Sequence, residues 1–132
     1  MSNQHHQKRI YIAGPMTGMP DCNRPAFHAE ANHQRERGHI PLNPAILPEG
    51  LNQAEYMACC LPMVMLADEL VMLPGWRDSL GATAEFHLAI KCGKVIRQAE
   101  DGFAWYPPRM RRRHDVRQPH LFARNHCQHR GS

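Results

Sequence analysis

Glu85 is the side chain of this sequence whose setting best suits chemistry on a bound ligand. It lies on a predicted helix, one turn after Gly81 and Ala82, which occupy positions i−4 and i−3 on the same helix face. Because those two side chains are small, they leave open space beside the carboxylate. The pattern therefore leaves two interpretations open: a carboxylate that faces a ligand, or a solvated glutamate on a helix surface, which is what such a pattern alone favours.

The turn before this helix adds a candidate anion site. The first backbone N–H groups of a helix are free, and the helix dipole favours a phosphate or carboxylate there. Ser79 either binds such a group through its hydroxyl or is an ordinary N-cap. Asp78 either contacts substrate or caps the backbone. Trp76, in a Pro-Gly-Trp turn, is expected to be an exposed loop tryptophan that stacks on a base or covers the site.

A second turn-rich loop, residues 14–21 (GPMTGMPD), follows the predicted strand at residues 9–14. Its Gly14-Pro15 turn lets the backbone approach a ligand closely, and Met16 comes next. Tyr11 on the strand either points its hydroxyl into this region or packs against a helix. The loop matches neither GxGxxG nor a P-loop, so the sequence predicts no dinucleotide cofactor and no nucleoside triphosphate hydrolysis.

The elements that must position these loops alternate along the chain. Short apolar strands are predicted at residues 9–14, 39–43, 69–73 and 94–96, with a possible fifth at residues 103–106. Helices are predicted between them, beginning near Asn23, near Asn52 and after Asp78 or Ser79. This order predicts a doubly wound (flavodoxin- or Rossmann-like) parallel sheet of four to five strands in three α/β/α layers. Ligands bind such sheets outside the carboxyl ends of the strands, where both loops lie.

Two asparagines and two prolines carry finer expectations. Asn23 is expected to cap the first helix, and Asn52 with Glu55 to form a capping box on the second. Pro62 is expected to kink or split that second helix. Pro41 in the second strand predicts a position at the edge of the sheet.

Length and charge limit the classes of protein. With 132 residues and a net charge of +4, the chain is one domain long. Residues 1–96 hold eight basic and nine acidic side chains, whereas residues 97–132 hold eight arginines and three acidic side chains. We therefore expect an α/β domain at residues 9–96 and a basic, poorly ordered extension at residues 97–132. Nucleic acid is an expected partner only through that extension, in which residues 111–113 are all arginine.

The remaining composition favours a cytoplasmic protein without cofactors. No apolar stretch approaches the ~20 residues of a membrane span, and the amino terminus does not resemble a secretory signal. The five cysteines are odd in number and lack paired CxxC spacing, which predicts neither a disulfide framework nor a zinc site. We expect no metal and no membrane partner.

Two long sequence segments and one dipeptide resemble those of a known protein family. The segments are YIAGPMTGMPDCNRPAF at residues 11–27 and ADELVMLPGWRDSLGATAEFHLAIKCGKVI at residues 67–96, with Asn43-Pro44 between them. Together they resemble the nucleoside 2-deoxyribosyltransferase-like superfamily, and within it a small phage and prophage branch of unknown function. The resemblance spans residues 9–96 and implies a doubly wound parallel sheet.

The resemblance also implies a reaction and a set of roles. Such proteins cleave or exchange the N-glycosidic bond of deoxynucleosides or deoxynucleotides, with a nucleophilic glutamate that Glu85 matches. Tyr11 matches a tyrosine that sets the nucleophile, and Ser79 a serine that binds phosphate or sugar. Small nucleosides or nucleotides are the implied partners, and a homo-oligomer, a dimer or larger, is the implied assembly.

The sequence departs from the family pattern at Cys60. Counting eight residues back from Asp68 reaches this cysteine, where the family carries an aspartate that binds the sugar or assists proton transfer to the leaving base. A protonated thiol cannot replace a carboxylate as an acceptor. The alternative to an enzyme is therefore a non-catalytic module that binds a nucleotide as a sensor.

Overall fold

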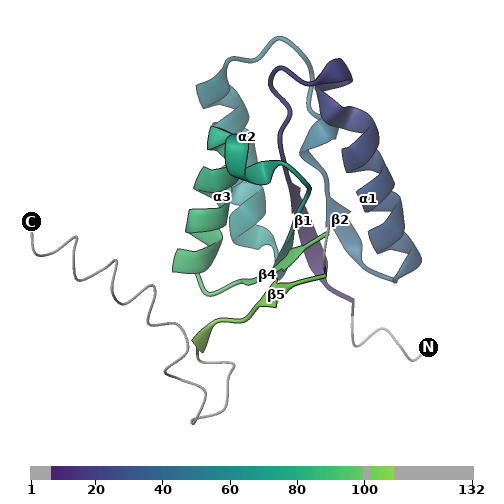
Figure 1. The fold of residues 1–132 in the computed structure, drawn as a ribbon, viewed down its shortest axis with the longest axis vertical. Coiled ribbons are helices and arrows are strands. Elements are labelled where there is room, and N and C mark those ends of the chain that lie inside the picture. Colours follow the sequence, from purple (N-terminus) through teal and green to yellow (C-terminus); the bar gives the residue numbers. More distant parts are fainter. Residues whose placement is uncertain (1–6, 100–101, 109–132) are drawn as a thin grey trace, which may run out of the picture.

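The computed structural model describes residues 7–99 and 102–108, and these form a mixed five-stranded sheet in the order β2-β1-β3-β4-β5 (Figure 1). Four strands run parallel: β1 (Arg9–Ala13), β2 (Ile40–Leu42), β3 (Glu69–Met72) and β4 (Val95–Gln98). The fifth, β5 (Ala104–Trp105), pairs antiparallel with β4. The predicted α/β fold is confirmed, with the expected parallel pairing in four strands, whereas the fifth strand is antiparallel.

Helices cover both faces of the sheet. Helix α1 (Arg24–Glu36) lies on one face, and α2 (Gln53–Leu66) and α3 (Leu80–Lys91) lie on the other (Figure 1). Alternate residues of the central strands serve the two layers, as the two-residue period of a strand requires. Ile10 and Ile12 pack with Phe27 of α1, whereas Tyr11 and Ala13 belong to the cluster beneath α2 and α3. Short 3-10 helices, η2 (Pro20–Asn23), η3 (Pro44–Ile46) and η4 (Trp76–Asp78), complete the loops.

Local sequence signals explain two of the three helix starts. Asn52 and Glu55 form the expected capping box, with reciprocal hydrogen bonds of 2.8 Å between side chain and backbone. Ser79 Oγ caps α3 by accepting from the Ala82 amide. The prediction for Asn23 is wrong: it makes no side-chain cap, adopts a left-handed conformation and donates from Nδ2 to the Pro15 carbonyl.

The proline expectations have different outcomes. Pro41 does lie in an edge strand, because β2 pairs with β1 alone. Pro62 does not split the second helix, which continues through it to Leu66. The burial of neighbouring Cys60 and Val64 on the sheet side of α2 accounts for this, since tertiary packing can hold a helix together around a missing backbone donor.

The sheet continues beyond residue 96. Strand β4 runs to Gln98, and Ile96 pairs with Trp105 across the antiparallel step to β5. The basic extension predicted after this point falls largely on residues 109–132, which lie outside the described residues. Within the described part of the chain, no helix is long and apolar enough to cross a membrane.

Candidate active site

A cavity of about 710 Å³ lies at the carboxyl edge of the parallel strands. That volume falls within the range of small-molecule sites. Its walls come from the loop after β1, the loop and first turn of α3 that follow β3, the inner side of α2, and the start of α1. The two loops that the sequence singles out therefore meet at one cavity, as the topology of a doubly wound sheet requires.

Glu85 and Tyr11 meet at the base of this cavity. Both residues line it, although Glu85 is only 6% exposed and Tyr11 is fully buried. The Tyr11 hydroxyl donates a hydrogen bond of 2.8 Å to Glu85 Oε2. The structure thus excludes the alternative of a solvated helix glutamate and joins the two side chains, which lie 74 positions apart in sequence.

Burial controls the ionisation of this pair. Desolvation raises the pKa of Glu85 to about 7, and the hydrogen bond from Tyr11 opposes that shift without cancelling it. Burial, together with the neighbouring Glu85 charge, raises the pKa of Tyr11 far above its usual value. Tyr11 therefore stays a hydrogen-bond donor, and the Glu85 carboxylate becomes increasingly ionised above neutral pH.

Two glycines shape the cavity for different reasons. A Cβ at Gly81 would meet only the Met57 Sδ at 3.6 Å and Ser79 Oγ at 4.0 Å, so this position leaves open space near the helix start. A Cβ at Gly14 would lie 2.8 Å from Leu73 Cβ, which is closer than real contacts. Gly14 is thus required by strand packing even though it also lines the cavity.

Of the remaining loop residues that the sequence predicted for the site, all but Trp76 line the cavity. Pro15, Met16, Asp78 and Ser79 all contribute to its wall. Ser79 Oγ is occupied as the N-cap acceptor, at 3.1 Å from the Ala82 nitrogen, but its hydroxyl proton remains available to a ligand.

The expectation of an exposed Trp76 is wrong. The residue is 8% exposed, stacks at 4.7 Å on the Phe86 ring and donates from Nε1 to Gln98 Oε1. It is absent from the cavity lining. The Pro-Gly-Trp turn is therefore packed against α3 and β4. Trp76 stabilises this loop through its contacts with Phe86 and Gln98, on the side away from the cavity.

The fold places Cys60 in the cavity wall and Asp68 outside it. Asp68 lies at the amino edge of the sheet, where it pairs with Arg9, and it does not line the cavity. Cys60 does line the cavity and is 5% exposed. Burial raises the pKa of its thiol, so the group facing Tyr11 and Glu85 from α2 is a neutral thiol.

Sequence reasoning missed several residues of the cavity, among them Cys22, Arg24 and Tyr56. Arg24 precedes Pro25 at the predicted helix start, a position that is usually solvated, so the pattern gave no reason to select it. Among residues 7–99 and 102–108, no group of three His, Cys, Asp or Glu side chains could hold a metal ion.

Comparison with known proteins decides the family. The family described as "Domain of unknown function (DUF4406)" matches residues 8–98. The chain belongs to this DUF4406 family. No curated protein matches its sequence.

The fold of this DUF4406 protein is similar to that of a solved 2-deoxyribosyltransferase from Leishmania mexicana. The two share 22% identity with a TM-score of 0.57, over 69% of this chain and 63% of the other. This DUF4406 chain therefore corresponds to less than two thirds of the length of that transferase. The likeness agrees with the fold expected from the resemblance to nucleoside 2-deoxyribosyltransferases.

Proposed function

We propose that this protein cleaves or exchanges the N-glycosidic bond of a deoxynucleoside or deoxynucleotide, with Glu85 as the nucleophile. The observation that carries the proposal is the buried Tyr11–Glu85 hydrogen bond at the base of the cavity. A carboxylate held by one phenol, with no cation beside it in the described hydrogen bonds and ion pairs, keeps its lone pairs reactive.

The reaction follows the two-step logic of retaining glycosidases. A Glu85 oxygen attacks the anomeric carbon of the sugar while the bond from that carbon to the base nitrogen breaks. The electron pair leaves with the base, which takes up a proton. Water, or a second base, then attacks the same carbon, gives up a proton to the group that protonated the first base or to solvent, and releases Glu85 as a carboxylate. Tyr11 holds the carboxylate in place through both steps.

Asp78 is the other carboxylate that lines the cavity. Because Cys60 is a neutral thiol and Asp68 lies at the opposite edge of the sheet, we assign to Asp78 the binding of the sugar or the transfer of a proton to the leaving base. Neither cofactor nor metal is needed for this chemistry, since the nucleophile, the acid and the water are all supplied by the site and the solvent.

The test is release of free base from a panel of deoxynucleosides and deoxynucleoside 5′-monophosphates, followed by chromatography. Glu85→Gln keeps the size and the acceptor for Tyr11 but removes the nucleophile, so we expect a loss of at least about 10⁴-fold. The matched control is Glu36→Gln, at an exposed glutamate on α1. Equal base release by the wild type and Glu85→Gln would exclude this mechanism.

A second candidate function is nucleotide binding without turnover. Cys60 favours it, because the thiol lines the cavity at the position where the resembled family carries an aspartate. Under this alternative, nucleotides raise the melting temperature of the wild type while no substrate in the panel yields free base. Base release that depends on Glu85 would eliminate it.

A further inference from the structure

Arg24 is the single lysine or arginine among the described residues that line the cavity. It is the first residue of α1, and α1 lies on the face of the sheet opposite α3, the helix that carries Glu85 (Figure 1). Its side chain is 19% exposed, so the guanidinium is partly buried at the cavity wall. The cavity therefore has a carboxylate at one side of the sheet edge and a guanidinium at the other.

Two acidic side chains hold the guanidinium. Arg24 Nη1 lies 3.1 Å from Asp21 Oδ1, and Nη2 lies 3.5 Å from Glu49 Oε2. Both carboxylates are mostly exposed, at 64% and 80%, so water readily solvates them when they are displaced. A guanidinium has five N–H donors, and these two contacts leave donors for a further acceptor.

The backbone before Arg24 has an unusual conformation and is hydrogen-bonded to the cavity wall. Asp21, Cys22 and Asn23 adopt consecutive left-handed conformations, with φ of 51°, 51° and 61°. L-residues rarely adopt this conformation, and here Asn23 Nδ2 fixes it by donating 2.9 Å to the Pro15 carbonyl. Since Pro15 lines the cavity, this bond ties the start of α1 directly to the cavity wall.

We propose that Arg24 is the anion-binding residue of this cavity, and that the preferred ligand is a deoxynucleoside 5′-monophosphate and not the free deoxynucleoside. The other acidic or basic side chains that line the cavity, apart from its cysteines and tyrosines, are Asp78 and Glu85, and both repel a phosphate. Arg24 is therefore the one charged side chain of the described lining that attracts a phosphate, and its paired N–H groups suit the phosphate oxygens. The Ser79 hydroxyl in the same wall is neutral and already accepts the Ala82 amide, so it adds a weaker contact.

This inference rests on the proposed function in one respect: it takes the ligand to be a nucleoside derivative with its anomeric carbon at Glu85. The 5′-phosphate is attached through C4′, the ring carbon across the ring oxygen from the anomeric carbon. A ligand with its sugar above the edge of β1 would thus extend from α3 toward α1. The ion pairs with Asp21 and Glu49 keep the guanidinium oriented until a phosphate replaces them.

Calorimetric binding of matched pairs tests the proposal without requiring catalysis. The probes are dAMP against deoxyadenosine, dCMP against deoxycytidine, dGMP against deoxyguanosine, dTMP against thymidine, and 2-deoxyribose 5-phosphate against 2-deoxyribose. We expect the wild type to bind the phosphorylated member of its preferred pair at least about tenfold more tightly. In Arg24→Gln the two members should bind about equally, whereas Arg35→Gln, on an exposed arginine of the same helix, should retain the preference.

Equal affinity for both members of every pair in the wild type would overturn the proposal, as would a preference that survives in Arg24→Gln. Glu49→Gln provides a test that does not depend on removing the arginine. Losing a competing, exposed carboxylate should tighten monophosphate binding by about two- to threefold and leave deoxynucleoside binding unchanged. Monophosphate binding that is unchanged or weaker in Glu49→Gln would contradict the assignment.

The outcomes separate this inference from the proposed function. Phosphate-dependent binding through Arg24 without any base release would support the Arg24 site and overturn the glycosidic-bond chemistry. Base release that requires Glu85 but ignores the phosphate would do the reverse.

Discussion

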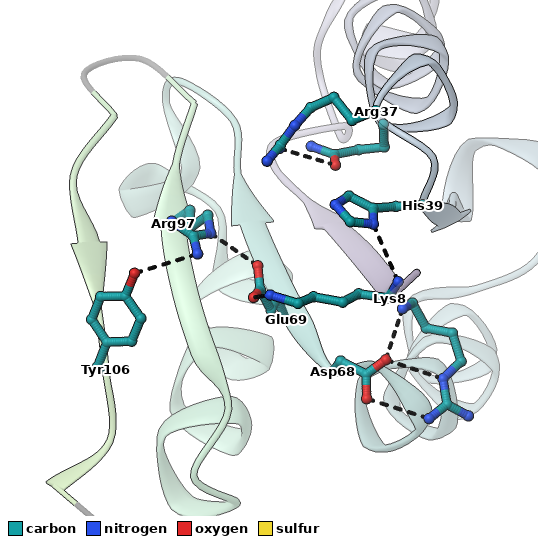
Figure 2. Close-up of polar contacts among 9 residues, drawn as sticks. Lys8, Arg37, His39, Asp68, Glu69, Arg97 and Tyr106 are labelled. Atoms are coloured by element: carbon teal, nitrogen blue, oxygen red, sulfur yellow. Dashed lines mark hydrogen bonds and ion pairs between the residues drawn. The ribbon is translucent and has the colours of Figure 1, made fainter. Parts of the chain in front are cut away.

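Glu69 and Glu85 are two glutamates that are equally buried, each 6% exposed, at opposite edges of the same sheet. Glu69, at the amino edge, accepts from Lys8 Nζ at 2.7 Å and from Arg97 Nε at 2.9 Å, and Figure 2 shows it between these two cations. Glu85, at the carboxyl edge, accepts a hydrogen bond of 2.8 Å from the phenol of Tyr11. The difference between them lies in their partners and not in their burial.

The partners give the two carboxylates opposite pKa shifts. Burial alone raises the pKa of Glu69, but the hydrogen bonds and charges of Arg97 and Lys8 outweigh burial and lower it. With a neutral donor alone, burial wins at Glu85 and the pKa rises to about 7. Glu69 therefore contributes to stability at neutral pH, whereas Glu85 costs stability there, which is typical of groups retained for reactivity.

The largest effect on stability is expected from Glu85→Gln at alkaline pH. Between pH 4.5 and 7 the folded wild type holds more protons than the unfolded chain, so its free energy of unfolding falls as pH rises, by about 3 kcal/mol in total. Glutamine does not titrate. Urea unfolding should show the variant more stable at pH 8 by up to about 3 kcal/mol and equal to the wild type near pH 4.5. Parallel pH profiles of the two proteins would contradict the raised pKa.

Glu69→Gln should act in the opposite direction. It leaves Lys8 and Arg97 beside a neutral amide, and because their side chains are 41% and 35% exposed, the expected loss is about 2 kcal/mol at pH 7. Since the pKa of Glu69 is lowered, this contribution is present above pH 4.5 and disappears as the pH falls through its folded value. Unfolding of this variant at pH 7 is the measurement, and a gain in stability would break the contrast with Glu85.

Tyr11→Phe tests whether the phenol hydroxyl lowers the pKa of Glu85. The hydrogen bond from Tyr11 lowers the pKa of Glu85, so its removal should raise that pKa further and move the acid limb of base release to higher pH. Near pH 7 we expect a rate loss of about tenfold. The matched control is Tyr106→Phe, whose hydroxyl lies 3.4 Å from Arg97 Nη2 at the other edge. An acid limb that stays in place in Tyr11→Phe would show that the phenol does not set this pKa.

The smallest effect is expected at the exposed pair next to Glu69. Arg9 and Asp68 approach to 3.2 Å, but their side chains are 46% and 41% exposed. Asp68→Asn should therefore cost only about 0.5 kcal/mol at low salt and less at high salt. Unfolding curves at the two ionic strengths check this. A loss as large as that of Glu69→Gln would mean that burial of the carboxylate does not distinguish the two pairs.

Much of the fold follows from local sequence signals. Apolar runs of strand length, separated by helices with caps such as Asn52 and Ser79, predict the α/β order, and Pro41 predicts an edge strand. The antiparallel pairing of β5 follows less directly, because a two-residue strand carries almost no pattern. Asn23 misled the cap prediction, since its side chain donates to the Pro15 carbonyl of the preceding loop and makes no cap hydrogen bond.

The candidate site, too, was predictable from the sequence only in part. The small residues before Glu85 marked it as a candidate from sequence, and the order of the strands predicted which two loops would meet. Only the tertiary structure decided that Glu85 is buried against Tyr11, that Trp76 faces inward, and that Arg24 reaches the cavity from the other face of the sheet. Periodicity fixes the side of an element on which a residue lies. Burial and ionisation depend on neighbours from distant segments, and these are set when the layers pack together.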